Sequence, residues 1–580
     1  MSDTLGVQGS KYWWRLPVEQ PELVGQIVRQ CNLSFPIAQA LISRGFGTKV
    51  EIERFLFSSY ERDVAHSSQM KDMVKAVERV LIAIERQERI LVFGDYDVDG
   101  ITSSALMMLC LPAIGAKINF FLPNRKRDGY GLSSKVVRQA ASSGYKLIIT
   151  VDNGVTAFEP AKVAKELGLD LIITDHHRAH GHLPDAYAIV NPNQVDCPYP
   201  HKTLAGVGVT FKLLSLIYEL KGMELPHKVY ELLMLGTIAD VVPLIGENRF
   251  WVQYGLNLAN QSQSLAFKTL KTNAGVDKAR LTSTDIGFSL TPQINALGRL
   301  EDPREGVQFL IDSDVDQVSR VGVILAELNQ ARKAIEKSIL DEIEQKIKSG
   351  EIDLTVDKVI IAAGRDWPAG VIGLVASRLV GKYGRPTILF HLTQDGLAKG
   401  SCRSISEFSI FDALVACQDL LIQFGGHSQA AGLALSIENL PKLKVRLEER
   451  VSAQLTEFDL QPKISLDASA QLSDLNSKFM QDLAMMEPFG HHNSCPAFLI
   501  TDVVQVQPPQ LMKEQHIKLQ VFADGVIKSV IFFYRPELYE QLVVQGQQPF
   551  SLAVQVTENH WQGRVNVELI GLDVCGLEKG

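Results

Sequence analysis

The sequence predicts an α/β protein whose largest domain is a doubly wound parallel sheet, followed by a smaller α/β domain and a small β-barrel. Three observations predict this architecture. Uniformly apolar strands alternate with amphipathic helices in the first 250 residues, a long helical pattern follows, and the C-terminal part is rich in short segments of alternating polarity. At 580 residues the chain exceeds what one hydrophobic core supports, so several domains are expected.

Residues 1–75 are predicted to form an N-terminal region of short helices, because apolar residues recur there at spacings of three and four. Residues 76–250 are predicted to form the doubly wound domain. Its expected strands are 89–94, 118–122, 146–151, 170–174 and 186–190. Their lack of polar alternation indicates a sheet that helices cover on both faces.

The structure of the remaining segments is predicted from the periodicity of their apolar residues. Residues 251–348 are predicted to be a helical extension that ends in one long helix from about Val315 to Lys348, of the kind that connects domains. Residues 349–450 are expected to form the smaller α/β domain, with strands at 358–364 and 386–390 around a helix. Residues 451–580 are expected to form a barrel or sandwich of short strands.

Composition narrows the class of protein. The seven cysteines are scattered and never form a CxxC pair, which argues against a disulfide framework and a structural zinc site. No signal peptide and no apolar run of roughly 20 residues is visible, so a cytoplasmic location without membrane association is expected. A net charge of −8 is unusual for a nucleic-acid-binding protein, but clustered carboxylates that hold cations would account for it.

Residues suited to metal binding follow three of the predicted strands. They are Asp95, Asp97 and Asp99 after 89–94, Asp152 after 146–151, and Asp175, His176 and His177 after 170–174. Asp240 follows another apolar run and is expected to join them. Because the carboxyl ends of the strands of an open α/β sheet line one crevice, these side chains are expected to converge there.

Carboxylates with imidazoles are the ligand set of Mn²⁺ or a similar divalent ion. There are more of them than one ion needs, so we expect two ions about 3.5–4 Å apart, an arrangement suited to in-line attack of water on phosphorus. A single aspartate after a strand is more often a helix N-cap. Three such strand ends together favour a metal site, in which Asp95 and Asp175 are assigned supporting roles.

The segments DYDVDG (95–100), VDNG (151–154), DHH (175–177) and GTIADVVPL (236–244) resemble, in this order and spacing, the four motifs of the DHH phosphoesterase superfamily, and within it the RecJ-like exonucleases. The resemblance covers nearly the whole chain. Further matching segments are PNRKRDGYGL (123–132), PQINALGRL (292–300), ELNQARK (327–333), GVIGLVASR (370–378), KGSCRS (399–404), FGGHSQAAG (424–432) and PFGHHN (488–493). The resemblance implies a DHH domain, a connecting helix, a DHHA1 domain and a C-terminal OB-fold.

The resemblance also implies roles for individual residues. The implied metal ligands are Asp97, Asp99, Asp152, His176 and Asp240, with His177 a ligand or a contact to the scissile phosphate. Arg125, Ser401 and Arg403 would hold a 5′-terminal phosphate, which suits the forked guanidinium group. Gly425, Gly426 and His427 would contact the substrate backbone, although GGH alone would be interpreted as a turn.

Basic residues flank the acidic motifs in sequence. They are Arg125, Lys126 and Arg127, and then Arg378, Lys382, Arg385, Lys399 and Arg403. They are expected to line a groove that binds phosphates independently of base sequence. The chain departs from the family pattern at Gln293, Leu297 and Pro368, which we interpret as adjustments in strand contact.

The expected function is 5′→3′ hydrolysis of single-stranded DNA to 5′-mononucleotides in DNA repair and recombination, with two divalent ions, Mn²⁺ rather than Mg²⁺. In the barrel, His516, Phe522, Phe532, Phe533 and Tyr534 are candidates for base stacking, although each on its own is more typical of a core residue. Two alternatives remain: a phosphodiesterase for nanoRNA or cyclic dinucleotides, and a non-catalytic DNA-binding scaffold. The family also suggests a helicase and a single-strand-binding protein as partners.

Overall fold

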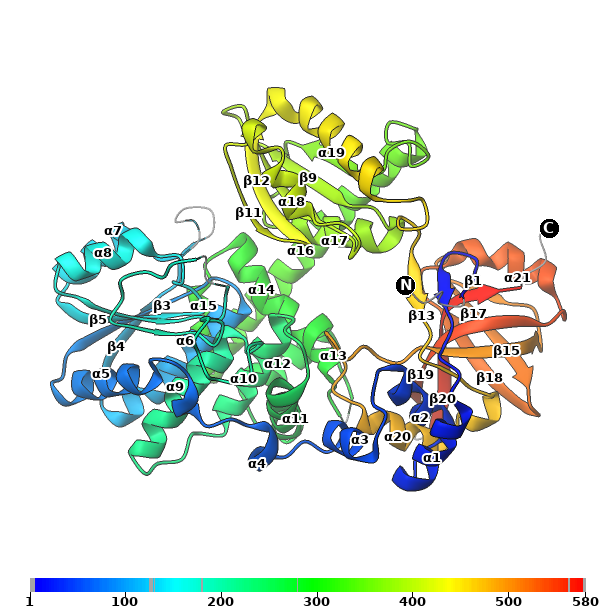
Figure 1. Ribbon diagram of the computed structural model, residues 1–580, viewed down its shortest axis with the longest axis horizontal. Coiled ribbons are helices and arrows are strands. Elements are labelled where there is room, and N and C mark those ends of the chain that lie inside the picture. The colour runs from blue at the N-terminus through cyan, green and yellow to red at the C-terminus, as the bar shows by residue number, and fades with distance from the viewer. Residues whose placement is uncertain are drawn as a thin grey trace. The chain divides into compact units, whose positions relative to one another are not determined.

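Figure 1 shows the protein as a computed structural model, which describes residues 6–124, 129, 131–178, 181–278, 280–561 and 564–576. Contacts divide the chain into two compact units. Unit 1 comprises Met1–Glu53, Arg332–Met485 and Cys495–Gly580, and unit 2 comprises Arg54–Ala331 and Met486–Ser494. Each unit is therefore assembled from segments that lie far apart in the sequence.

Unit 2 is built around a five-stranded parallel sheet in the order β4-β3-β5-β6-β7. The strands are β3 (Arg89–Gly94), β4 (Lys117–Phe121), β5 (Tyr145–Val151), β6 (Asp170–Thr174) and β7 (Ala188–Val190). All five predicted strands are present. The second strand, β4, lies on one side of β3 and the third, β5, on the other, so the order of the sheet reverses between β3 and β5. In an open α/β sheet such a reversal marks the ligand-binding crevice.

Helices cover both faces of this sheet. Helices α5 (Met73–Glu85), α6 (Val98–Cys110) and α9 (Gly206–Leu220) pack with Ile90 and Val92 on one face. Helices α7 (Ser134–Ser142) and α8 (Phe158–Glu166) pack with Leu91 and Phe93 on the other. Successive residues of a strand point to opposite faces, so a strand covered on both sides is apolar throughout. The predicted doubly wound sheet is confirmed.

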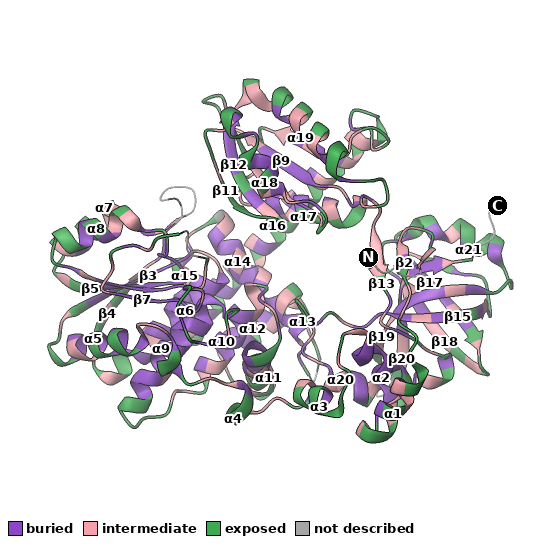
Figure 2. Cartoon of the chain, in the orientation of Figure 1, coloured by how far each residue is buried: buried purple, intermediate pink, exposed green. Residues whose placement is uncertain are grey.

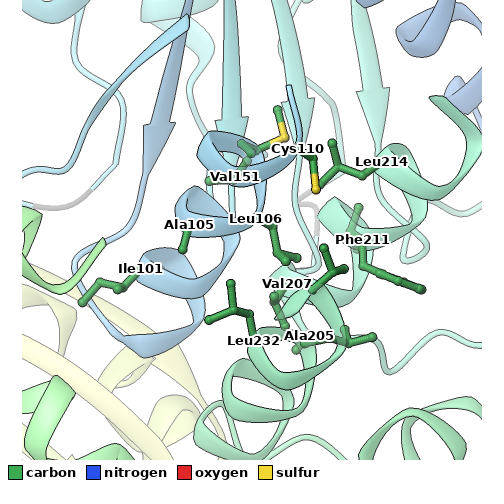
Figure 3. Close-up of a cluster of buried hydrophobic side chains, with 14 of the residues drawn as sticks. Ile101, Ala105, Leu106, Cys110, Val151, Ala205, Val207, Phe211, Leu214 and Leu232 are labelled. Carbon is green, nitrogen blue, oxygen red and sulfur yellow. The ribbon is translucent and has the colours of Figure 1, made fainter. Parts of the chain in front are cut away.

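A group of helices completes unit 2 on the α6 side. The elements are α4 (Tyr60–Asp63), η1 (Ser67–Gln69), η2 (Pro112–Ile114), α10 (Lys228–Ala239), α11 (Gly246–Ala259), α12 (Leu265–Ala274), α13 (Ser283–Asp285), η3 (Ile286–Leu290), α14 (Thr291–Leu300) and α15 (Arg304–Ile311). Figure 3 shows how side chains of α6 and α9 meet Leu232 of α10 in the shared core. The packing holds the ends of these three helices in fixed relation to the sheet.

The predicted connecting helix is α16 (Val315–Lys348), a single helix with the expected bounds. Val321 and Leu325 are buried in the core of unit 2, while Ile339 and Ile343 are buried in unit 1. The helix therefore contributes apolar side chains to both units, each along its own part of the helix.

The smaller α/β domain of unit 1 has a five-stranded sheet in the order β11-β12-β10-β9-β8. Only β8 and β9 are parallel; the other neighbours are antiparallel. The elements are β8 (Ile360–Gly364), α17 (Ile372–Tyr383), β9 (Thr387–Leu392), β10 (Leu397–Arg403), α18 (Ile410–Val415), η4 (Gln418–Leu420), β11 (Gln423–His427), β12 (Ala430–Ser436), η5 (Ile437–Asn439) and α19 (Leu440–Gln454).

The C-terminal part of unit 1 is a closed barrel. Strand neighbours run β15-β19-β20-β18-β17, and β17 pairs again with β15 to close the ring. The elements are β14 (Ala468–Ser469), η6 (Leu472–Asp474), α20 (Ser477–Met485), β15 (Phe498–Gln505), β16 (Gln510–Met512), β17 (His516–Ala523), β18 (Val526–Phe532), η7 (Pro536–Leu538), α21 (Tyr539–Gln545), β19 (Phe550–Trp561) and β20 (Arg564–Cys575). Alternating polarity predicted a barrel or a sandwich and the family resemblance implied a barrel, which is confirmed.

The N-terminal region differs in part from the prediction of helices alone. Helices α1 (Pro21–Cys31), α2 (Phe35–Ser43) and α3 (Lys49–Leu56) are present, but β1 (Gly6–Gln8) and β2 (Trp13–Arg15) precede them. These strands form a sheet with β13 (Lys463–Ser465), which lies far along the chain. Three-residue strands are too short to show a periodicity, so their pairing partner decides their structure.

The buried residues lie mainly in the cores of these domains. Figure 2 shows the buried residues concentrated along the parallel sheet and α6 in unit 2, and along the inner strands of the smaller α/β domain and the barrel in unit 1. Over the described part of the chain, no helix has the length and apolarity needed to cross a membrane.

Candidate metal centre

The polar residues that follow the parallel strands lie at the reversal point of the sheet in unit 2. Asp97 follows β3 and is the N-cap of α6, where its carboxylate accepts a hydrogen bond from the Gly100 N–H at 3.1 Å. Asp152 follows β5, and its backbone N–H bonds to the carbonyl of Thr174 at the end of β6. The ends of neighbouring strands therefore bring these carboxylates to one edge of the sheet, as predicted.

Asp99 is held by the first turn of α9. Its two carboxylate oxygens accept hydrogen bonds from the backbone N–H groups of Gly206 and Val207, each at 2.7 Å. The first N–H groups of a helix have no partner within the helix and favour a negative charge. A β-carbon on Gly206 would lie 2.5 Å from both Cβ and Oδ1 of Asp152, so only glycine lets α9 begin this close to the site.

His176 lies at the centre of the cluster. Its Nε2 is 3.2 Å from Oδ1 of Asp152, 3.6 Å from Oδ2 of Asp240 and 3.9 Å from Oδ2 of Asp99. Asp240 reaches the cluster from the C-terminal end of α10, as the residue that caps this helix. The structure therefore brings the predicted ligands at the strand ends together with Asp240 at the end of α10.

Ligand atoms of three overlapping groups lie within 4.8 Å of one another. The groups are Asp152 with His176 and His177, Asp99 with His176 and Asp240, and Asp95 with Asp97 and Asp152. Because the groups share Asp152 and His176, the arrangement is that of one extended centre with room for more than one cation.

Several of these polar atoms are buried without a hydrogen-bond partner among the described residues. They are Oδ1 of Asp152, Nε2 of His176 and Oδ2 of Asp240. Buried polar atoms are nearly always paired, and an unpaired one costs about 1–3 kcal/mol. Three such atoms that point to one place fit a bound cation, which oxygen and imidazole ligands of this kind would coordinate.

The pKa values of the clustered side chains are also consistent with a bound cation. Burial, followed by the charge of Asp97, raises the pKa of Asp99 to about 7. Burial and then neighbouring carboxylates, Asp99 first among them, raise the pKa of Asp152 and Asp240 well above its usual range. Burial also lowers the pKa of His176 to about 4, which leaves its imidazole neutral and able to bind a metal.

His177 differs from His176 because Asp175 holds its ring. Nδ1 of His177 lies 2.8 Å from Oδ1 of Asp175, and Asp175 also accepts bonds from the backbone N–H groups of His176, His177 and Val155. Burial acts to lower the pKa of His177, but the bond to Asp175 and its charge raise it to about 9. Asp175 therefore orients both histidines, while Asp95 uses Oδ1 to accept the backbone N–H of Tyr96.

The predicted phosphate-binding residues of unit 1 lie on β10, against the first turn of α17. Nη1 of Arg403 is 3.3 Å from Oγ of Ser401, and both side chains lie close to Gly373 in that turn. A serine hydroxyl, a guanidinium and a helix N-terminus are donors that suit a phosphate. Arg125 lies outside the described residues, as do Lys126 and Arg127.

Two of the other basic residues, Arg378 and Lys382, form ion pairs with carboxylates. Arg378 is 58% exposed and pairs with Glu336 at 2.6 Å, and Lys382 pairs with Glu344. Two of the basic residues that were expected to line a phosphate-binding groove are therefore paired with carboxylates. Gly426 and His427 lie in the exposed end of the β11–β12 hairpin.

The barrel aromatics fall into two groups. Phe532 is fully buried in the barrel core, whereas Tyr534 is 72% and Phe533 is 47% exposed, and Phe522 is also exposed. The ring of His516 packs edge-on against Phe533 and Tyr534. The interpretation of these aromatics as core is thus right for Phe532 and wrong for the other two phenylalanines and Tyr534.

The interpretation of Gln293 and Leu297 as adjustments in strand contact is wrong. Both are 1% exposed, and Nε2 of Gln293 donates to the carbonyls of Leu270 and Ser289. These two residues pack inside unit 2. Pro368 is partly exposed, and its carbonyl accepts the Val371 N–H where α17 begins.

Two structural supports of the site were missed by the sequence analysis. Oδ1 of Asn295, on α14, accepts the Val98 N–H at 3.1 Å and so braces the loop that carries Asp97. Segment 486–494 packs in unit 2, where the carbonyl of His491 accepts the Leu244 N–H. Both residues lie in segments that match the family, but nothing in the sequence indicated which part of the fold they contact.

Three family profiles match the chain in the order of its domains. The DHH family, N-terminal domain, matches residues 89–237, the DHHA1 domain matches residues 356–453, and the RecJ OB domain matches residues 466–573. The first covers the parallel sheet with Asp97, Asp99, Asp152 and His176, the second the smaller α/β domain and the third the barrel.

Curated relatives match most of the chain. The single-stranded-DNA-specific exonuclease RecJ of Bacillus subtilis (strain 168) is 36% identical over 571 residues, which cover 98% of this chain and 71% of the relative. The protein of the same name from Salmonella typhimurium is 33% identical over 563 residues, covering 92% and 95%.

Solved structures of RecJ are similar to this chain over nearly its whole length. The crystal structure of RecJ in complex with Mn²⁺ from Thermus thermophilus superposes with a TM-score of 0.82 at 26% identity and covers 98% of this chain and 80% of that chain. The structure of the complex with Mg²⁺ from the same organism gives a TM-score of 0.75 at 25% identity, with 98% and 79% covered.

Proposed function

The chain belongs to the RecJ family of single-stranded-DNA-specific exonucleases, and we propose that it hydrolyses single-stranded DNA from the 5′ end to 5′-mononucleotides, in DNA repair and recombination. It is a metal-dependent phosphodiester hydrolase of this family. One observation carries the assignment of the site: Asp152, His176 and Asp240 each bring a buried atom without a hydrogen-bond partner to the same place.

The residues that would hold two divalent cations are Asp97, Asp99, Asp152, His176 and Asp240. The chemistry that such ions supply is Lewis acidity toward a phosphoryl oxygen and acidification of an attacking water. The protein contributes the placement: α9 holds Asp99 through two backbone N–H groups, and Asp152 and His176 leave the ends of adjacent strands. Imidazole among the ligands favours Mn²⁺ over Mg²⁺, which prefers oxygen.

His177 has a different role in this proposal. Its ring is fixed at Nδ1 by Asp175 and its pKa lies at about 9, so the imidazole is protonated near neutral pH. We assign Nε2 of His177 as the donor to a non-bridging oxygen of the scissile phosphate. A positioned cationic donor of this kind stabilises the charge that develops on phosphorus-bound oxygens.

The polarity of cleavage is assigned to the capture of the 5′-terminal phosphate. Ser401, Arg403 and the first turn of α17 provide hydroxyl, guanidinium and backbone donors, and Arg125 is assigned to the same phosphate by family resemblance. Arg378, Gly426 and His427 are assigned to the backbone of the following nucleotides. Exposed Phe533 and Tyr534 are suited to stacking bases of a longer strand.

The family resemblance also suggests a helicase that supplies single strands and a single-strand-binding protein that covers them. Both partners fit an enzyme that removes nucleotides from one end of an unpaired strand.

The function is tested with strands that carry a label at either end. Wild-type protein with Mn²⁺ is expected to release the 5′ label first, as a mononucleotide, and to leave the matching duplex intact. His176→Ala is expected to abolish release while the circular dichroism spectrum stays unchanged. Early loss of a 3′ label, or near-normal rates in His176→Ala, would contradict the assignment. Comparing a long strand with a dinucleotide separates this function from that of a nanoRNA phosphodiesterase.

A further inference from the structure

A buried asparagine lies between the strands that lead to the metal centre. Asn153 follows Asp152 in the VDNG segment and is fully buried, yet the function described so far gives it no role. A buried amide needs hydrogen-bond partners, because an unpaired donor in a core costs free energy. The partners of Asn153 show which parts of the sheet it joins.

The side-chain amide of Asn153 bonds to two strands at once. Its Nδ2 donates to the carbonyl of Val151, on β5, at 2.9 Å and to the carbonyl of Phe93, on β3, at 3.3 Å. Both acceptors are carbonyl oxygens, so the amide nitrogen with its two N–H bonds faces them. Since β3 leads to Asp97 and β5 to Asp152, the amide ties together the ends of two strands whose carboxylates meet in the centre.

The bond to Val151 also encloses Asp152. The Val151 carbonyl and the Asn153 amide lie on either side of Asp152 in the chain, so their bond closes a short ring around its backbone. Asp152 has a φ of 62°, in the left-handed region that residues other than glycine rarely adopt. Such a conformation persists only where the surrounding structure imposes it. Asn153 supports it from one side, and the bond from the Asp152 N–H to the Thr174 carbonyl, at 3.0 Å, supports it from the other.

Two buried threonine hydroxyls extend this network to β6. Oγ1 of Thr150 donates to the backbone carbonyl of Asn153 at 2.6 Å, and Oγ1 of Thr174 donates to the carbonyl of Thr150 at 2.7 Å. Both threonines are fully buried near the ends of otherwise apolar strands. Because β6 leads to His176, the hydrogen bonds run from β3 across β5 to β6 and join three strand ends that carry ligands of the centre.

The turn around Asn153 is closely packed. Gly154 has a φ of 117°, and a β-carbon there would lie 2.6 Å from Oγ1 of Thr150. The Val155 N–H donates to Oδ2 of Asp175, the residue that orients the two histidines, at 2.8 Å. A change at Asn153 is therefore transmitted to the groups of the centre on either side of this turn.

We propose that Asn153 is a positioning residue for the metal centre. Its amide fixes the left-handed conformation of Asp152 and ties β5 to β3, while the two threonine hydroxyls tie this turn to β6. Asn153 touches neither the cations nor the DNA in this proposal. The proposal rests on the proposed role of Asp152 as a metal ligand.

The test measures Mn²⁺ binding by isothermal titration calorimetry without DNA, and then kcat and KM on a single-stranded oligonucleotide. Asn153→Ala removes both amide bonds and is expected to weaken Mn²⁺ binding by about 10–100-fold, the usual effect of losing a residue that orients metal ligands. At limiting Mn²⁺ kcat should fall while KM for DNA stays the same, because Asn153 does not contact the strand. Excess Mn²⁺ should restore kcat.

A second pair of variants tests the network through a hydroxyl group. Thr150→Val keeps the shape of the side chain but cannot donate to the Asn153 carbonyl, so it should also weaken Mn²⁺ binding. Thr150→Ser keeps the hydroxyl and is expected to recover most of the affinity. If Asn153→Ala does not fold, the comparison of Thr150→Val with Thr150→Ser decides.

Ile148→Ala is the control for a general loss of stability. Ile148 is fully buried on the same strand, in the core beneath α7 and α8, and its side chain has no polar atom that could join the network. Ile148→Ala should lower the Tm and bind Mn²⁺ as the wild type does. Wild-type Mn²⁺ affinity in both Asn153→Ala and Thr150→Val, or an equal loss of affinity in Ile148→Ala, would overturn the inference. Wild-type affinity in Asp152→Asn would instead overturn the assignment of Asp152 as a ligand.

Discussion

At the scale of single residues, the centre gathers more negative charge than the protein neutralises. Asp99 and Asp152 are almost completely buried, and Asp240 is largely buried. Burial raises the pKa values of all three carboxyl groups, and neighbouring carboxylates raise them further. Bringing such charges together costs free energy of folding unless protons or cations compensate them. The site is therefore built for bound cations at the expense of stability without them.

The first prediction concerns metal removal and Asp240→Asn. The pKa of Asp99 is about 7 in the folded chain against 3.8 ordinarily, so its ionisation favours the unfolded chain. The metal-free protein should lose stability as the pH rises from about 4 to about 7, and Mn²⁺ should restore it. Asp240→Asn removes one of these charges and should raise the Tm in EDTA by about 2–4 °C.

Differential scanning calorimetry at several pH values, with EDTA or Mn²⁺, measures these changes. The same variant should lose at least about a hundredfold in kcat, more than is typical of a residue that only orients a ligand. A Tm in EDTA that does not change with pH in this window would contradict the account of the buried carboxylates. Asp185→Asn, at an exposed ion pair with Lys165, serves as the control for removal of a surface charge.

At the scale of elements, the centre depends on where α6, α9 and α10 begin and end. Asp97 caps the start of α6, Gly206 and Val207 at the start of α9 bind Asp99, and Asp240 caps the end of α10. The apolar packing in Figure 3 holds the three helices together. The positions of the carboxylates at these helix ends are thus set by the core beneath them.

Gly206→Ala tests this dependence. Its β-carbon would meet Asp152 at 2.5 Å, so the start of α9 must move away and take its two N–H groups from Asp99. We expect a loss of about a hundredfold in kcat, since displacement of a catalytic group by about 1 Å has an effect of this size. Activity assays and Mn²⁺ titration measure the change.

Gly208→Ala is the matched control in the same helix. Its β-carbon would lie 3.4 Å from Leu204, an ordinary contact, so activity should remain close to that of the wild type. Equal activity of the two variants would show that the start of α9 does not position Asp99 and Asp152.

At the scale of the whole molecule, segments distant in sequence complete one another within each unit. In unit 1, Asp573 on β20 is fully buried and ties the N-terminal strands to the barrel. It accepts bonds from the backbone N–H groups of Lys11 and Tyr12 and from Nε1 of Trp14, and it pairs with Arg535 at 3.1 Å. In unit 2, the corresponding link is the segment Met486–Ser494.

Asp573→Ala is expected to destabilise unit 1 by about 3–5 kcal/mol, because it leaves the buried Arg535 without its buried carboxylate and three other donors unpaired. Denaturant unfolding of the full chain measures the change. Mn²⁺ affinity under native conditions should be unchanged, since the centre lies in unit 2. Glu540→Ala, at an exposed position of α21, should change stability by less than about 0.5 kcal/mol. Equal stability of Asp573→Ala and wild type would contradict the role of Asp573.

The sequence by itself determined the parts of this protein that depend on local pattern. Apolar runs defined the five parallel strands, periodicity defined α16 from Val315 to Lys348, and the strand ends marked Asp97, Asp152 and His176 as neighbours. These features are readable because strand and helix periods are set by the backbone, and because parallel strands must present their carboxyl ends at one edge.

Only the tertiary structure decided which distant groups complete those parts. It joined the backbone of His491 to Leu244, buried Gln293 in the core, and paired β2 with β13. Contacts of this kind leave no periodic trace in the sequence, because a three-residue strand or a single buried amide acquires its role from the partner that folding brings beside it. The ligand types of the centre were thus readable from the chain, and their convergence and support depended on the packed helices around them.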